Sequence, residues 1–191
     1  MKKSTIIILV VLALLALWGV KAYNGLVKNQ ESVSSAWSQV ENNYQRRSDL
    51  IPNLVATVKG YAEHESSTLE AVVQARANAT SVNGGNLSEE EVAAYQKAQG
   101  EVSSALGRLL VVVENYPELK ANENFLDLQA QLEGTENRIA EARRQFNETA
   151  KAYNVKVRTF PSNIVASIFG FDAKGYFEAD EAAKTAPKVE F

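Results

Sequence analysis

The sequence predicts an all-α fold, in which an N-terminal transmembrane helix is followed by an antiparallel bundle of three long helices plus a short fourth. One observation behind this prediction is an unbroken apolar run near the N-terminus. Another is the recurrence of apolar residues every three or four positions through most of the remaining chain. No stretch shows a convincing period of two, which a half-buried strand requires. The 191 residues, 46% of them hydrophobic, fit one globular domain with an appendage.

The apolar run is expected to be a retained membrane anchor. No charged side chain lies between Lys3 and Lys21, and the nineteen residues from Thr5 to Tyr23 reach the roughly 17–25 residues that a membrane-spanning helix needs. A cleaved signal peptide is the alternative, but Val20-Lys21-Ala22 is a poor cleavage site. A buried core helix is a further alternative, against which the uninterrupted apolar run argues. Residues 1–28 are therefore predicted to form the anchor and its juxtamembrane segment.

The charges that flank this span predict its orientation. Lys2, Lys3 and the α-amino group precede it, whereas Lys21 and Lys28 follow it before the first acidic residue. Positive charge is enriched on the cytoplasmic side of membrane proteins. The small excess at the N-terminus therefore favours a single-pass protein with its N-terminus inside and its body outside the cytoplasm.

The first helix of the body is expected from Gln30 to Val82. Its apolar residues fall three or four positions apart, and no strong breaker appears before Asn83-Gly84-Gly85-Asn86. Pro52 is expected to kink this helix without ending it. The alternative is a pair of helices that meet at Ile51-Pro52, with the proline in the first turn of the second.

The later helices carry clearer signals at their ends. Ser88 and Glu91 form a capping-box pattern for a second helix, which stops before Tyr116-Pro117. Asn122 is expected to cap a third long helix with an apolar residue at every seventh position. That helix is expected to end at Phe160-Pro161.

A short fourth helix completes the predicted bundle. Ser162 is expected to cap it, and Gly170 is expected to end it. The bundle thus covers residues 29–170, and residues 171–191 are expected to form a mostly extended tail that docks by its aromatic side chains.

The expected helix lengths leave one apolar stripe without cover. A second helix of about 42 Å, at 1.5 Å per residue, would reach back only to the level of Leu54. The stripe Val33, Trp37, Val40 and Tyr44 would then be exposed, and exposed apolar stripes mark interfaces. We predict that it is a partner surface, for self-assembly or for a second membrane protein. The alternative is that the tail folds along it, with Phe171, Tyr176 and Phe177 as the cover.

Few residues offer catalytic or metal-binding chemistry. The chain has no cysteine and one histidine, which excludes disulfides, Cys-ligated zinc and His-rich metal sites, and the net charge of −3 argues against nucleic-acid binding driven by positive charge. Glu63, His64 and Glu65 are consecutive, and on a helix their side chains would point about 100° apart, so they would not share a metal. We predict no catalytic residue, no metal, no cofactor and no small-molecule substrate.

Arg47 falls within the apolar stripe of the first helix. The simpler interpretation is that its guanidinium extends to solvent along the apolar surface. The alternative is an ion pair that sets helix register, and Glu136, Arg138 and Arg143 of the third helix raise the same question.

Several long blocks resemble the LemA family. They are YNGLVKNQESVSSAWSQVENNYQRRSDLIPNLVATVKGYAEHE (23–65), ENYPELKANENFLDLQAQLEGTENRIAEARRQFNETAKAYN (114–154), FPSNIVASIFGF (160–171) and Tyr176-Phe177-Glu178. The motif residues include Arg46, Arg47, Asp49, Pro52, Asn53, His64, Glu65, Glu136, Asn137 and Arg143. The resemblance implies a bacterial membrane protein with one N-terminal span, a helical bundle and no established enzymatic activity.

The resulting functional hypothesis is a scaffold or interaction protein of the bacterial cell envelope, in contact with the lipid bilayer and with a second copy or another membrane protein. The main alternative is a hydrolytic enzyme that uses Glu63, His64 and Glu65. Membrane remodelling by amphipathic helices is a third possibility. It is weakened because all 23 acidic residues lie after Asn29, whereas four of the 20 basic residues precede it.

Overall fold

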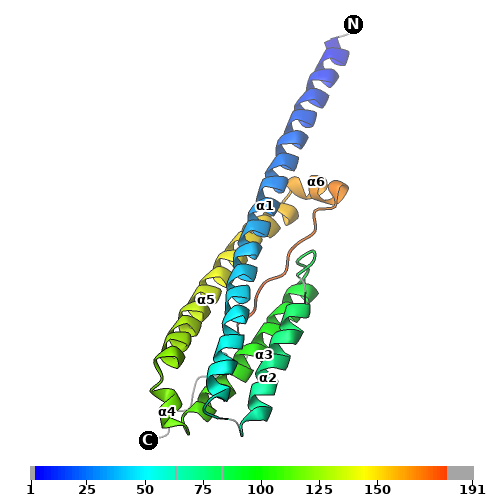
Figure 1. The fold of residues 1–191 in the computed structure, drawn as a ribbon. Helices are drawn as coiled ribbons and strands as arrows, with labels where there is room; N and C mark the ends of the chain where they lie inside the picture. The colour runs from blue at the N-terminus through cyan, green and yellow to red at the C-terminus, as the bar shows by residue number, and fades with distance from the viewer. Residues whose placement is uncertain (1–2, 63, 83, 180–191) are drawn as a thin grey trace, which may run out of the picture.

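The computed structural model describes residues 3–62, 64–82 and 84–179, and over these residues it contains helices and no strand. The helices are α1 (Lys3–Lys59), α2 (Ser66–Ser81), α3 (Glu89–Val113), α4 (Pro117–Lys120), α5 (Glu123–Arg158) and α6 (Ser162–Phe169). The predicted all-α class is confirmed, and Figure 1 shows the bundle with the N-terminal part of α1 projecting beyond it.

The predicted anchor and the first helix of the body are one continuous helix. α1 has 57 residues, which corresponds to about 85 Å at 1.5 Å per residue. Its N-terminal part has a mean hydropathy of 2.4 in its most apolar window and is not buried by the rest of the chain. This one helix is long and apolar enough to cross a membrane. The boundary at residue 28 stays a prediction, because α1 passes through it without a break.

The prediction of one helix from Gln30 to Val82 is wrong. α1 ends at Lys59, and after a loop the chain reverses into α2, which runs back beside α1 (Figure 1). The apolar stripe continues across the loop in nearly the same phase, so the periodicity gave no sign of the turn. The reversal buries Leu69, Val72 and Ala79 of α2 against the other helices, whereas a continuous helix would extend them away from the bundle.

Pro52 lies inside α1, so the alternative break at Ile51-Pro52 is also wrong. A proline has no N–H and leaves the carbonyl four residues before it without its helical donor. Here that carbonyl belongs to Ser48, and it accepts a hydrogen bond of 2.9 Å from Nε of Arg76 in α2. Because the chain reverses after α1, Arg76 of α2 can supply the hydrogen bond that the Ser48 carbonyl lacks.

The predicted helix ends are confirmed at three positions. Ser88 and Glu91 form the capping box of α3, and the Asn122 side chain accepts from the Phe125 N–H at the start of α5. Gly170 ends α6 in the left-handed region, with φ of 71°. The predicted cap at Ser162 is wrong, because its hydroxyl donates instead to the carbonyls of Lys156 and Thr159 at the end of α5.

Two apolar clusters fill the bundle at different levels along α1. The lower core lies between α1, α2, α3 and α5 and is mostly aliphatic; it includes Ile51, Leu54, Val58, Leu69, Val72, Val102, Leu109, Val113, Leu119, Phe125 and Leu132. The aromatic core lies nearer the N-terminal part of α1 and includes Val33, Trp37, Val40, Tyr44, Leu87, Val92, Tyr95, Ile139, Phe146, Tyr153 and Phe177.

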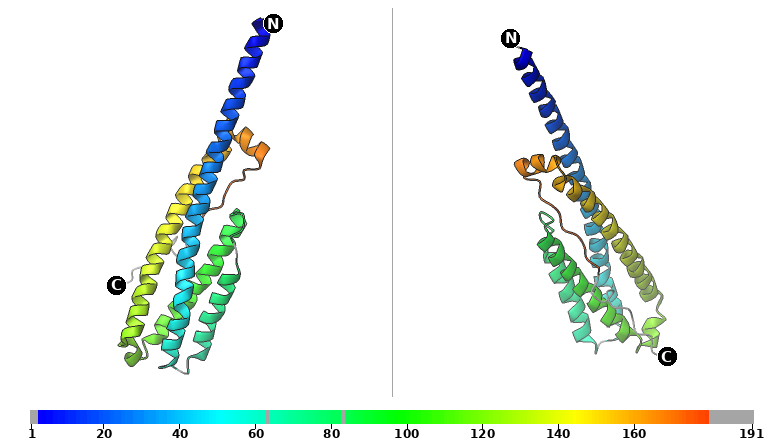
Figure 2. Two further views of the ribbon diagram at one scale, coloured as in Figure 1. Left: turned by 45° about the horizontal axis from the view of Figure 1, so that its top comes forward. Right: turned by 180° about the vertical axis from the view of Figure 1, so that it is seen from behind.

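After α5 the chain turns into α6, which lies beside α1 where α1 leaves the bundle (Figure 1). From Gly170 an extended segment runs back along the bundle beside α1 and towards the start of α3, as the second view in Figure 2 shows. The expectation of an extended docked tail therefore holds for residues 171–179, and residues 180–191 lie outside the described part of the chain.

Candidate functional site

The extended tail is held by side-chain amides from two helices. We call the tail-binding surface formed by Gln96 of α3 and Asn147 and Asn154 of α5 the tail groove. Asn154 accepts from the Lys174 N–H at 2.8 Å and donates to the Lys174 carbonyl at 2.7 Å. Asn147 makes the same pair of bonds with the N–H and carbonyl of Phe177, at 2.9 and 2.8 Å.

Gln96 repeats this arrangement one residue further along the tail. Its amide oxygen accepts from the Glu178 N–H at 2.9 Å, and its amide nitrogen donates to the Glu178 carbonyl at 3.0 Å. The Glu178 carbonyl also accepts from Arg143 at 2.8 Å. Each amide therefore offers a donor and an acceptor to one residue's main chain, as the neighbouring strand does in a β-sheet.

Backbone also approaches backbone within the groove. The Gly175 N–H donates to the Leu87 carbonyl at 2.9 Å, and a Cβ on Gly175 would lie 2.7 Å from the Cα of Glu89. Only glycine fits such an approach without displacement. The groove thus requires a glycine three positions before the last residue that it binds.

Phe177 is the apolar anchor of the tail. Its ring stacks on Trp37, with centroids 5.7 Å apart and an interplanar angle of 12°, and meets the edge of Phe146 at 5.5 Å. The guanidinium of Arg143 lies 5.0 Å above the same ring. Such aromatic and cation–π contacts add to the burial of the ring itself.

The stripe Val33, Trp37, Val40 and Tyr44 is buried inside the chain. The prediction that it lacks an intramolecular cover is wrong, because α1 ends earlier than expected and α3 therefore begins nearer the membrane-proximal end of the bundle. Tyr95 of α3 contacts both Trp37 and Tyr44, with centroids 4.9 and 5.5 Å apart. The alternative of a covering tail is confirmed for Phe177.

The loop before α3 closes another side of Trp37. A Cβ on Gly84 would lie 2.3 Å from Cζ2 of the indole, so the loop can approach only as glycine. The Gly-rich turn that the sequence indicated therefore has a packing role beside the tryptophan.

Arg47 forms a polar junction between the two cores. Its side chain is 1% exposed and donates to Glu136 and Ser103 at 2.7 Å, and to the carbonyl and side-chain oxygens of Gln99 at 2.9 and 2.8 Å. The interpretation as a solvent-seeking side chain is wrong, and the alternative of an ion pair across helices is confirmed. Glu136 remains 45% exposed, so only the arginine is taken out of water.

The junction contacts the aromatic core through Tyr44. The Arg47 guanidinium lies 5.0 Å from the Tyr44 ring centroid. Burial raises the pKa of Tyr44, against the opposing influence of the Arg143 and Arg47 charges, and burial likewise raises the pKa of Tyr95. Both phenols therefore stay protonated near neutral pH, and the junction joins α1, α3 and α5.

The described residues of the hydrolytic alternative lie in a loop. His64 and Glu65 lie between α1 and α2, so the helical geometry assumed for them is wrong, and Glu63 lies outside the described residues. The Glu65 carboxylate accepts from the Tyr116 hydroxyl at 3.1 Å, and this bond raises the pKa of Tyr116. Within the described residues, no three His, Asp or Glu side chains gather as they would around a metal ion.

Other predicted motif residues are dispersed. Arg46, Asp49, Asn53 and Asn137 are exposed along α1 and α5. Of the motif residues in α1 and α5, the structure brings Arg47 to Glu136 and Arg143 to the tail.

The groove amides were missed by the sequence analysis. A signal was present: Asn147 and Asn154 are seven residues apart on α5, each directly after an apolar stripe residue, Phe146 and Tyr153. Positions seven apart share a helix face, so two amides there indicate a polar line beside the core.

A polar pocket of about 480 Å³ opens beside the junction between α1, α2 and α3. Its lining is mostly polar and includes Glu41, Arg76 and Gln99. Small-molecule sites are usually lined by apolar and aromatic side chains. The tail groove, which combines ordered main-chain recognition with an aromatic anchor, is the better candidate site.

Comparison with known proteins places the chain in a family. The family model described as the LemA family matches residues 36–191. Magnetosome protein MamQ of Magnetospirillum gryphiswaldense is 28% identical over 182 residues, which cover 85% of this chain and 67% of MamQ. Protein LemA of Metamycoplasma hominis is 26% identical over 158 residues, which cover 83% of this chain and 69% of that protein. The match over most of its length shows that this chain belongs to the LemA family.

Proposed function

We propose that the protein is a membrane-anchored interaction scaffold that binds an extended peptide segment in its tail groove. In the absence of a partner the occupant is its own segment 171–178. A competing segment would come from a second copy of the chain or from another membrane protein of the cell envelope.

The observation that carries this proposal is the set of paired amide–backbone hydrogen bonds. Gln96, Asn147 and Asn154 recognise the main chain, which every peptide shares, and only the Phe177 site and the close approach at Gly175 select side chains. Extended peptides are commonly bound in this way, with main-chain bonds for affinity and pockets for specificity. A segment with a glycine followed two positions later by an aromatic residue would fit.

The anchor supports the proposal from the other end of the molecule. The exposed apolar length of α1 would hold the bundle at a bilayer, with the N-terminus inside and the body outside the cytoplasm. Confinement to a surface raises the effective concentration of partner segments, so a groove already occupied in cis could still exchange its occupant.

A peptide-binding experiment tests the groove. The Phe177→Ala variant of the full chain, in detergent micelles, should bind a labelled peptide of residues 171–179 at least about tenfold more tightly than the wild type, whose own tail competes. The matched control adds Asn147→Ala to this variant and should lose the binding. A folded Phe177→Ala variant that binds the peptide no better than the doubly substituted chain would disprove the proposal.

A further inference from the structure

α6 presents apolar side chains that the rest of the chain does not cover. Ile164 is 49% exposed and Ile168 is 71% exposed, and Phe160, one turn earlier, is 75% exposed. Val165 and Ala166 are buried, and they contact Leu26 of α1. α6 is therefore an apolar helix fixed to α1 by one side, with a second apolar side left free.

The position of α6 along α1 coincides with the end of the predicted span. Besides Leu26, it packs on Ala22, and the ring of Phe169 meets the edge of Tyr23 with centroids 4.9 Å apart. The predicted span ends at Tyr23. Figure 1 and Figure 2 show α6 beside α1 and running sideways away from it, so a membrane crossed by α1 would have α6 lying along its surface.

The polarity of α6 fits such a surface. Successive residues are about 100° apart around a helix, so Ile168 and Phe169 lie within about 60° of Val165 and Ile164 about 100° from it, whereas Asn163 and Ser167 lie almost opposite it. Val165 faces the span, because it lines an apolar groove of about 350 Å³ together with Phe169 and with Ala16, Gly19, Val20 and Tyr23 of α1. The apolar side of α6 is thus directed to the span and its polar side away from it.

Basic residues surround this level, and α6 itself has no acidic residue. Lys21 and Lys28 lie on α1 on either side of Leu26, and Lys156 and Arg158 lie in the last turn of α5. All four are exposed. Exposed lysine and arginine at a membrane boundary favour lipid phosphates, and tyrosine, here Tyr23, favours the same layer.

We propose that α6 is an interfacial helix that inserts Ile164, Ile168 and Phe169 into the leaflet from which α1 emerges, with lipid acyl chains filling the groove between α6 and α1. The inference rests on the membrane anchoring in the proposed function. Its consequence is that the bundle has two attachments to the membrane, and that the tail begins at the second one, directly after Gly170.

Single-cysteine labelling of the full chain tests the inference, because the protein has no native cysteine. An environment-sensitive fluorophore would be attached to Leu12→Cys in the span, to Ile168→Cys, or to Ser167→Cys on the polar side of α6. Each labelled chain would be reconstituted in phosphatidylcholine vesicles that contain lipids with a quencher on the acyl chain. Circular dichroism would verify that each variant is folded.

The inference expects strong quenching at Leu12 and Ile168 and at least about threefold weaker quenching at Ser167, one residue away. Quenching at Leu12 with equally weak quenching at Ile168 and Ser167 would overturn the interfacial helix and leave the anchor intact. Weak quenching at all three positions would overturn the anchor as well.

Discussion

The two cores of this bundle are built differently, although both lie along α1. The lower core is enclosed by helices and filled mostly by Leu, Ile, Val and Ala. The aromatic core lies between α1, α5, the first turns of α3 and the loop before α3. It is filled by Trp37, Tyr44, Tyr95, Phe146 and Tyr153 and closed by a tail without secondary structure.

The comparison shows how the chain replaces a missing helix. α2 is shorter than α1 and reaches only part of its length (Figure 1), so the upper level lacks a fourth helical wall. Large rings span the wider gap, and the tail closes it. An extended segment cannot satisfy its own backbone groups, which is why the amides of Gln96, Asn147 and Asn154 are needed there and have no counterpart in the lower core.

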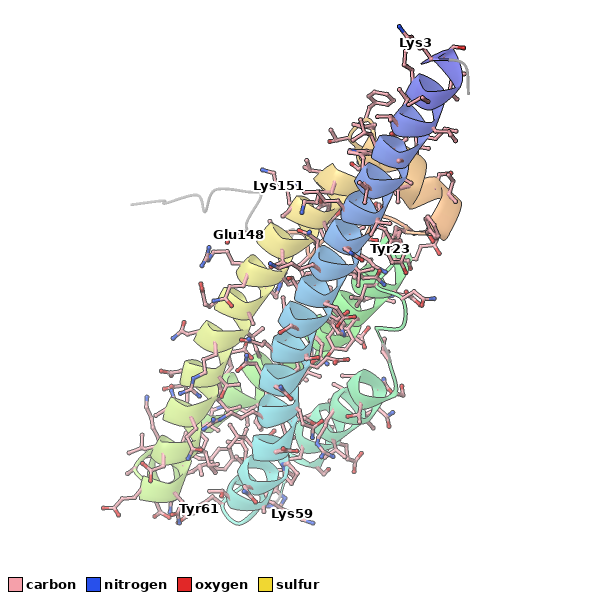
Figure 3. The ribbon with its side chains drawn as sticks, turned by 90° about the horizontal axis from the view of Figure 1, so that it is seen from above. Lys3, Tyr23, Lys59, Tyr61, Glu148 and Lys151 are labelled. Atoms are coloured by element: carbon pink, nitrogen blue, oxygen red, sulfur yellow. The ribbon has the colours of Figure 1, made fainter. Side chains whose placement is uncertain are left out.

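Figure 3 shows the bundle from above, with the charged side chains of α5 on its outer surface. Glu148 and Lys151 are labelled there and point away from the other helices, whereas Asn147, next to Glu148 in the sequence, binds the tail. α5 therefore carries charged residues on its solvent-exposed face, apolar residues on the face that packs in the core, and the tail-binding amides beside them.

The largest expected effect compares a truncation in each core and asks whether it also loosens the tail. Trp37→Ala should cost about 3–5 kcal/mol of unfolding free energy, and Leu54→Ala in the lower core about 2–5 kcal/mol. Only Trp37→Ala should also raise hydrogen exchange at the Lys174 and Gly175 amides, because it removes the surface on which Phe177 stacks. Urea unfolding followed by circular dichroism and exchange mass spectrometry would measure both. Equal exchange in the two variants would refute the division into two cores.

The next effect concerns the junction between the cores. Arg47→Ala leaves the Gln99 oxygens without their donor and should cost about 3 kcal/mol, the lower limit for breaking a buried pair. Glu136→Gln keeps an acceptor for the guanidinium but removes its counter-ion, so it leaves a buried charge uncompensated and should also cost about 3 kcal/mol. Urea unfolding measures the two values. A loss below about 1 kcal/mol for Glu136→Gln, as for an exposed pair, would contradict the assignment of the desolvated group to the arginine.

A smaller effect is expected from the tail groove itself. Asn147→Ala removes both hydrogen bonds to Phe177 and should cost about 1–2 kcal/mol, at about 1 kcal/mol for each bond. The loss should appear as faster hydrogen exchange in residues 174–178 with little change in α2. Thr149→Ala, two residues further along α5, is a matched control that should leave the tail protected, since its hydroxyl bonds within the helix.

The smallest effect is local to the start of α3 and depends on pH. Ser88→Ala should cost about 1 kcal/mol by removing the cap. The bond from the Ser88 N–H holds the pKa of the Glu91 carboxyl below its ordinary value of 4.5. Since the folded pKa is the lower one, this contribution is complete above about pH 4.5 and is lost as the pH falls through the folded value.

Glu91→Gln keeps an acceptor for the Ser88 N–H but does not titrate. The melting temperature, measured by thermal unfolding between pH 3 and pH 6, should therefore fall less steeply on acidification in Glu91→Gln than in the wild type. Identical slopes would show that the capping box contributes nothing to the acid sensitivity of the fold.

The sequence anticipated the elements whose signals are local. The capping box at Ser88, the cap at Asn122 and the glycine at residue 170 each act within a few residues, so they could be recognised without knowing the neighbours. The role of Arg47 was only narrowed to two alternatives, because a charged residue on an apolar stripe is explained equally by solvent and by a partner until the opposite helix is placed.

What the sequence determined by itself is the helical class, the apolar N-terminal length of α1 and the family, since these depend on periodicity, composition and long blocks of residues. The tertiary structure decided where the chain reverses and what covers Trp37. The loop at residues 60–65 is set by the gain from burying α2 and by Arg76 reaching the carbonyl that Pro52 leaves free, and neither is visible in the periodicity of one segment. The amides on α5 acquire their role only when the tail, far along the chain, lies against them.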